Sequence, residues 1–383
     1  MKKKLVLTGI ITLLLVFGMA VMSCGDKETG DPTSPNSGDS GWPEVTVPAT
    51  TLAGALLWLG SNNVTNQTNY IIELAGNESI GHQTLGFPFG KSVTIILRGG
   101  SSEKTVSLIK TVSLSSDDSL FTIRSGVKLV LDSNVTLQGL SGNNDSLVKL
   151  HGGTLVMNDG SKITGNDNTS YGGGGVLVVE GTFTMSGGTI SGNTAPFSGG
   201  VNVVSGMFTM LGGTISGNTA SGSYGGGVGG GGTFTMSGGT ISGNTASGSY
   251  GGGVEVGGGT FTMSGGTISG NTASSQGGGV GAGGGTFAMS GGTISNNTAY
   301  YYGGGVFGTL TMTGGTISGN TASSDGGGVC GKLIKTGGSS ITSTNSAPTG
   351  KVAYVSSSQK RETAAGPGVN LDYRVSGLLG GWE

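Results

Sequence analysis

Charged and histidine side chains are scarce in this chain. Asp, Glu, Lys and Arg make up only 10% of its 383 residues, and between Gly181 and Gly331 the only charged residues are Glu255 and Asp325. This scarcity excludes a nucleic-acid-binding surface and a polybasic membrane patch from that stretch. Glycoside chemistry needs two carboxyl groups on one face, but these two lie three repeat units apart, roughly 14 Å at about 4.8 Å per β-coil. We expect no catalysis, no metal site and no cofactor; a polysaccharide-acting enzyme is the minor alternative.

Cysteine is also nearly absent, with Cys24 and Cys330 as the only two. Cys24 follows three lysines, an apolar run over 5–21 and the sequence "VMSC", which resembles the lipobox of bacterial lipoproteins. The resemblance implies a signal peptide over 1–23 and a mature chain held to a membrane by lipid on Cys24. The alternative is an ordinary secretory signal with a chance cysteine. If Cys24 is lipidated, Cys330 has no disulfide partner and is expected to be an inert thiol.

The remaining chain changes character in steps. A polar segment rich in Gly, Ser, Pro and Asp reads as a flexible tether, and leucines near helical spacing then predict a short helix over roughly 50–60 with Thr50 or Thr51 as its N-cap. From Tyr70 apolar residues alternate, which is typical of strands. The predicted parts are a lipidated tether over 24–46, a capping helix and lead-in over 47–67, irregular coils over 68–152, regular repeats over 153–355 and a tail or cap over 356–383.

Glycine is abundant, with 84 residues, but it recurs with a period. Units resembling "GTFTMSGGTISGNTA…GGGV" start at intervals of 23 to 28 residues from Gly153 to Gly331, and each contains three short pieces of alternating apolar residues. This unit is too short for a propeller blade and lacks the helical pattern of leucine-rich repeats. It predicts an all-β fold, a parallel β-helix with three strands per coil, in which each coil supplies a surface for its neighbours.

Strand alternation assigns the inward side chains. Four apolar columns are expected to form the core, and one asparagine column is expected to form a structural amide ladder. In the unit at Gly232, Val254 and Val256 are expected to point inward and Glu255 outward. The columns are Phe183, Phe208, Phe234, Phe261, Phe287 and Leu310; Met157, Met185, Met210, Met236, Met263, Met289 and Met312; Ile163, Ile190, Ile215, Ile241, Ile268, Ile294 and Ile317; Val176, Val201, Val228, Val254, Val280, Val306 and Val329; and Asn193, Asn218, Asn244, Asn271, Asn297 and Asn320.

The recurring "GGGV" and "ISGN" elements resemble the GGA[ILV] and FxxN elements of chlamydial polymorphic outer-membrane proteins, with Ile in place of Phe. This resemblance covers about 153–330. The whole layout, from the lipobox to the "GGWE" end, is similar to repeat-rich surface lipoproteins of spirochaetes and gut anaerobes. The resemblance implies a right-handed β-helix on the cell envelope, at the outer membrane or cell surface, with an adhesin-like activity.

Aromatic residues precede many of the glycine corners and form the candidate binding site. Because corresponding corners stack, these rings are expected to form one edge stripe. One interpretation is a structural stack that shields the corner; the other is a platform for sugar rings or partner aromatics. The expected protein is a monomeric adhesin-like or glycan- or matrix-binding lipoprotein, and the alternative is a spacer or coat without a ligand. The stripe residues are Tyr171, Phe197, Tyr224, Tyr250, Tyr300, Tyr301 and Tyr302.

Overall fold

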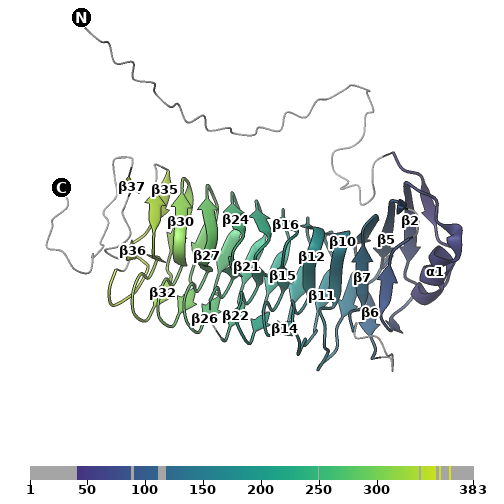
Figure 1. Ribbon diagram of the computed structural model, residues 1–383, viewed down its shortest axis with the longest axis horizontal. Helices are drawn as coiled ribbons and strands as arrows, with labels where there is room; N and C mark the ends of the chain where they lie inside the picture. The colour runs from purple at the N-terminus through teal and green to yellow at the C-terminus, as the bar shows by residue number, and fades with distance from the viewer. Residues whose placement is uncertain are drawn as a thin grey trace, which may run out of the picture. The chain divides into compact units, whose positions relative to one another are not determined.

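The chain folds into a parallel β-solenoid, as the sequence predicts (Figure 1). The computed structural model describes residues 41–87, 90–110, 118–248, 250–335, 338–350, 353–354 and 362–363. Cys24, the predicted signal peptide, most of the tether and most of the 356–383 tail lie outside these residues. In the described part, strands from successive coils pair in parallel, and one sheet takes one strand from each of 11 coils. Those strands are β3 (Glu78–Ile80), β6 (Lys104–Leu108), β9 (Val135–Gln138), β11 (Lys162–Thr164), β13 (Thr189–Ser191), β17 (Thr214–Ser216), β21 (Thr240–Ser242), β25 (Thr267–Ser269), β28 (Thr293–Ser295), β31 (Gly315–Ser318) and β35 (Ser339–Ile341).

A larger sheet contains two of the three predicted pieces of each unit. The "GGGV" and "TFTM" pieces follow one another along it, and in four coils they form one unbroken strand. Its strands are β1 (Glu44–Thr46), β2 (Thr68–Glu73), β4 (Gln83–Leu85), β5 (Val93–Arg98), β7 (Phe121–Arg124), β8 (Val127–Leu131), β10 (Val148–Met157), β12 (Val176–Met185), β15 (Val201–Val203), β16 (Met207–Met210), β19 (Val228–Gly230), β20 (Thr233–Met236), β23 (Val254–Glu255), β24 (Thr260–Met263), β27 (Val280–Met289), β30 (Val306–Met312), β33 (Val329–Cys330), β34 (Leu333–Lys335), β36 (Ala353–Tyr354) and β37 (Glu362–Thr363).

A third, narrow sheet was not predicted. It consists of two-residue Thr-Ala strands, and its alanines are buried, so it adds a fifth apolar column to the core. Its strands are β14 (Thr194–Ala195), β18 (Thr219–Ala220), β22 (Thr245–Ala246), β26 (Thr272–Ala273), β29 (Thr298–Ala299) and β32 (Thr321–Ala322).

The four predicted apolar columns are buried and in register. Phe208 pairs with Phe234 and Phe234 with Phe261, and neighbouring ring centroids along the phenylalanine column lie 4.6–4.8 Å apart with planes within 11° of each other. The methionine, isoleucine and valine columns pair in the same way. Burial of such side chains is the main favourable term in folding. Because identical residues stack, each coil covers the apolar face of the next.

The asparagine column forms a continuous buried hydrogen-bond ladder. Asn218 donates from Nδ2 to Asn244 Oδ1 at 3.0 Å and to the carbonyl of Ile190 at 3.0 Å, and its backbone N–H donates to the same Oδ1. The pattern repeats along the column and ends on Asn345. Buried amides are stable only when their donors are satisfied, and here each Nδ2 has acceptors in neighbouring coils.

A short helix lies at the N-terminal end of the solenoid (Figure 1). Helix α1 (Leu52–Trp58) begins at Thr51, whose hydroxyl accepts from the Gly54 N–H, and continues into a π-helical turn η1 (Leu59–Asn63). Leu52 and Leu59 pack against the core. β1, within the stretch expected as tether, pairs with β2 and so extends the large sheet. None of the helices in the described ranges is long and apolar enough to span a membrane.

Candidate functional site

The glycine corners that carry the aromatic residues stack from coil to coil. The backbone of Tyr250 pairs with Gln276, Gln276 with Tyr302, and Tyr302 with Asp325. The corner residues therefore form an axial row along one edge of the solenoid. The side chains of this row do not form one unbroken column of ring contacts, however, because Gln276 and Asp325 occupy two of its positions.

The first group of rings joins three consecutive coils. Phe197 lies between Tyr171 and Tyr224, with ring centroids 5.4 and 5.2 Å apart and planes inclined by 29° and 31°. Tyr171 is 80% exposed, whereas Phe197 and Tyr224 are half-buried. Phe197 is therefore covered by a ring on each side, whereas Tyr171 forms an exposed end of the group. Its geometry suits the stabilisation of stacked coils.

The second group contains an aromatic residue that is not among the predicted stripe residues. Tyr250 stacks on Phe307, with ring centroids 6.2 Å apart and planes inclined by 15°. Phe307 lies on the outward face of β30, where its backbone pairs with Gly281 of the preceding coil. Gly281 has no side chain between the two rings, so a contact across two coils becomes possible. The available signal was an aromatic residue at an outward strand position beside a glycine.

The third group is the triplet Tyr300, Tyr301 and Tyr302. The rings of Tyr300 and Tyr301 meet edge to face, with centroids 4.8 Å apart and planes at 89°, and Tyr302 lies 6.1 Å beyond Tyr301. Tyr300 is 61% exposed and Tyr301 is 48% exposed. An edge-to-face pair turns two ring faces in different directions. Of the three groups, this one offers the largest accessible aromatic surface on a single coil.

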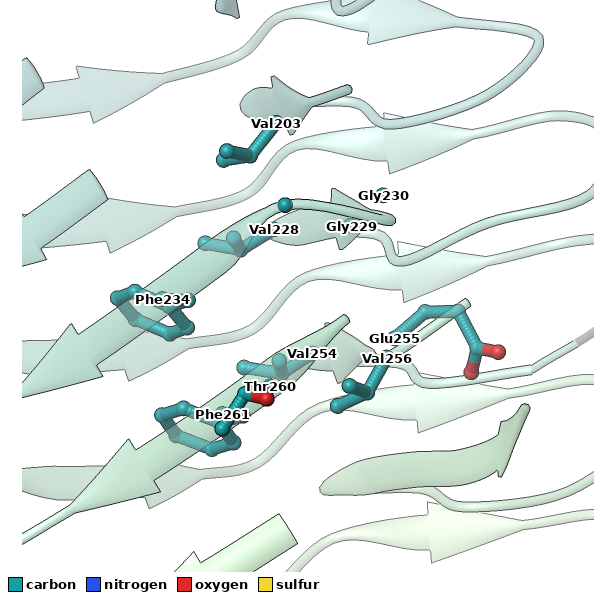
Figure 2. Close-up of a pocket in the computed structure, with 11 residues that line it drawn as sticks. Val203, Val228, Gly229, Gly230, Phe234, Val254, Glu255, Val256, Thr260 and Phe261 are labelled. Carbon is teal, nitrogen blue, oxygen red and sulfur yellow. The ribbon is translucent and has the colours of Figure 1, made fainter. Parts of the chain in front are cut away.

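Glu255 corrects one expectation about the corner. It points away from the core, opposite to Val256, as alternation predicts (Figure 2), but it is only 7% exposed rather than open to solvent. Its carboxyl group lies over Gly281 and beside Tyr250, since a Cβ added to Gly281 would meet Glu255 Oε2 at 2.2 Å and the Tyr250 Cβ at 3.2 Å. The corner loop therefore covers the outward face of the strand. Glycine at 281 provides the space for this carboxyl group.

The surroundings of Glu255 disfavour its charged form. Its Oε2 has no hydrogen-bond partner, and burial raises the pKa of this carboxyl group to about 8. The buried Oε1 of Gln276, on the next corner, also lacks a partner. Glu255 is thus a largely neutral group beneath the corner at neutral pH and not an exposed acid available to a substrate.

The second acid of the central coils, Asp325, also affects a buried group. Burial, followed by the negative charge of Asp325, raises the pKa of the Cys330 thiol to about 12. A thiol with that pKa stays protonated and is a poor nucleophile. Among the described residues, no three His, Cys, Asp or Glu side chains are placed to share a metal ion.

A small cavity opens beside Gly230, between the side chains of Val203, Val256 and Phe234 (Figure 2). Gly230 occupies the inward position that Val203 holds in the preceding coil, but its φ of 125° and the approach of a Cβ to the Val203 carbonyl at 2.1 Å exclude a side chain. The space is water-sized and apolar on most sides. It is a packing gap and not a ligand site.

Comparisons of the chain with family models, with curated proteins and with solved structures gave no match.

Proposed function

We propose that this chain is a lipid-anchored protein of the cell envelope, exposed at the cell surface, which binds a glycan or a matrix protein without catalysing a reaction. The anchor would be lipid on Cys24, as the lipobox resemblance implies. The solenoid would act as a rigid stalk that presents its corners to the partner.

The observation that carries this proposal is the exposure of aromatic rings on a rigid and nearly uncharged scaffold. Tyr300 and Tyr301 are 61% and 48% exposed. Contiguous exposed apolar surface often marks a binding site, and aromatic side chains offer large contact area at little cost in conformational entropy. A spacer without a ligand needs no such rings.

The test is a binding screen with the mature chain carrying Cys24→Ser, which keeps the protein soluble. Immobilised neutral glycans, acidic glycans and matrix proteins are the probes. We expect saturable binding to at least one class. A chain that is folded by circular dichroism yet binds none of these would favour the spacer.

The spacer remains the second candidate because one ring group suits it. Phe197 contacts Tyr171 and Tyr224 across successive coils, so these rings contribute to coil stacking whether or not a ligand exists. Catalysis has weaker support, since Glu255 is buried and Asp325 lies three coils away along the corner row.

A further inference from the structure

The surface around Tyr300 and Tyr301 combines exposed rings with a near absence of charge. Glu255 and Asp325 are the only charged residues between 181 and 331. Glu255 is buried, and its raised pKa of about 8 keeps it mostly neutral at pH 7. Asp325 is therefore the one other acidic residue of this stretch of sequence, which contains no Lys, Arg or His.

Serines border the two tyrosines on both neighbouring coils. The Tyr301 N–H donates to the Ser275 carbonyl at 2.8 Å, and the Tyr301 carbonyl accepts from the Ser324 N–H at 3.0 Å. These bonds fix the backbone of the tyrosine segment from both sides. Ser274 and Ser323 are exposed. Each directly follows the Thr-Ala strand of its coil, the position that Tyr300 has in the coil between them. The two rings thus stand above polar, hydroxyl-bearing neighbours; we call Tyr300 and Tyr301 the tyrosine ridge.

The size of the tyrosine ridge favours a small ring-shaped ligand over a protein partner. An aromatic side chain buries about 150–250 Å² when fully covered, so two half-exposed rings offer on the order of 200 Å². A stable protein interface needs about 800 Å² from each partner. The ridge has room for one or two sugar rings. A sugar has an apolar ring face and a rim of hydroxyl groups, which match the tyrosine rings and the serine hydroxyls respectively.

We infer that the tyrosine ridge binds an uncharged saccharide unit of a neutral polysaccharide. One sugar ring stacks on a tyrosine ring, and sugar hydroxyl groups bond to serines of the adjacent coils. This inference rests on the proposed binding function and narrows its ligand class. Sulfated or carboxylated glycans find no Lys or Arg between residues 181 and 331 to pair with, and Asp325 repels them. Since no ion pair contributes, binding is insensitive to salt.

The experiment measures binding of the mature Cys24→Ser chain to immobilised β-glucan, mannan and galactan, and to hyaluronan and heparin. Neutral polymers should bind, with affinity unchanged between about 0.05 and about 0.5 M NaCl. The double variant Tyr300→Ser, Tyr301→Ser gives this coil the same "Ala-Ser-Ser" sequence that both neighbouring coils have, so it should fold. We expect it to lose at least about tenfold in affinity, or about 1.4 kcal/mol. Tyr171→Ser, which removes an even more exposed ring of another group, should keep full affinity.

Three results would overturn the inference at different levels. Preferential binding of hyaluronan or heparin, or loss of binding at high salt, would exclude an uncharged ligand while leaving the binding function standing. Unchanged affinity of the double serine variant would exclude the tyrosine ridge as the site. If the folded chain bound none of these polymers and none of the matrix proteins of the wider screen, the proposed function itself would be wrong.

Discussion

Asn297 donates a hydrogen bond from its side-chain amide to Oδ1 of Asn320, one coil further on, at 2.9 Å. The same Nδ2 donates to the carbonyl of Ile268, and Oδ1 of Asn297 accepts from both the backbone and the side chain of Asn271. Each asparagine of the ladder is therefore both donor and acceptor to fully buried groups. Loss of one member leaves several of them without partners.

We expect Asn297→Ala to reduce the free energy of unfolding by about 3 kcal/mol or more, since each buried polar group left unsatisfied costs about 1–3 kcal/mol. Denaturant unfolding followed by circular dichroism measures the loss. The neighbouring Asn296 provides the control because it is exposed, has a φ of 57°, and stands where the other coils have glycine. Asn296→Gly should change stability by no more than about 0.5 kcal/mol. Similar losses in both variants would contradict a structural ladder.

Neighbouring residues of a "TFTM" strand face opposite sides, so substitutions at Met263 and Thr262 can be compared directly. Met263 is buried and Thr262 is half-exposed on the opposite face. Met263→Asp should destabilise the middle coils by at least about 3 kcal/mol, because it buries a charge without a partner. Thr262→Asp should be neutral within about 0.5 kcal/mol. The difference in melting temperature between the two variants reports which side chain faces the core.

The buried carboxyl group of Glu255 predicts a pH dependence of stability. Its pKa is about 8 in the folded chain and has an ordinary value of 4.5 when exposed, so between these pH values the folded state holds a proton that the unfolded state has lost. The contribution of this group to the free energy of unfolding is fully present below about pH 4.5 and is lost as the pH rises toward about 8. At about 1.4 kcal/mol per unit of pKa difference, the loss is at most about 5 kcal/mol.

Glu255→Gln removes this titration, and we expect it to flatten the stability profile between pH 5 and pH 8 and to raise stability at pH 8. Chemical denaturation at several pH values provides the measurement. Glu180→Gln, at an exposed position, is the control and should leave the slope unchanged. A slope that persists in Glu255→Gln would assign the pH dependence to other groups.

The first aromatic group is expected to act on stability and not on binding. Phe197→Ala removes two ring contacts and should lower the free energy of unfolding by about 1–3 kcal/mol, given about 0.5–1.5 kcal/mol for each aromatic pair. Thermal unfolding measures this loss. The serine variant of the tyrosine ridge also loses two ring contacts, but these join residues of a single coil whose rings are largely exposed, so its melting temperature should fall less than that of Phe197→Ala. An opposite pattern, with a stable Phe197→Ala variant and an unstable ridge variant, would reverse the two assignments.

Cys24 is expected to carry the membrane anchor. Cys24→Ser in the producing cell should abolish incorporation of labelled palmitate and release the protein into the soluble fraction. Fractionation and autoradiography test both effects. Cys330→Ser is the control, since this thiol is buried with its pKa raised to about 12, and should leave labelling intact. Continued membrane attachment of the Cys24→Ser chain would favour an uncleaved apolar helix.

The columns of the core follow directly from the sequence because alternation fixes which residues face inward, and near-identical units fix the register. The burial of Glu255 could not be predicted in this way. Alternation places it on the outer face of its strand, but only the path of the corner loop decides whether that face meets water. The contact between Tyr250 and Phe307 depends on the absence of a side chain at Gly281. These three residues lie on successive coils and are far apart in the sequence, so no local pattern links them. The alanine column was missed since a two-residue strand has no detectable period.

The in-register pairing of Thr233 with Thr260 has an evolutionary consequence. If residues 233–259 were deleted, Gly232 would join Thr260, Phe208 would meet Phe261, and Val228 would meet Val280. Each column would close again with the same residue types. Unequal recombination between repeats of the gene would then shorten or lengthen the solenoid by whole coils, about 4.8 Å at a time, without a faulty intermediate. The length of the solenoid is thus a heritable property that can change independently of the sequence of any coil, and under the proposed anchoring it would set the reach of the protein from its membrane.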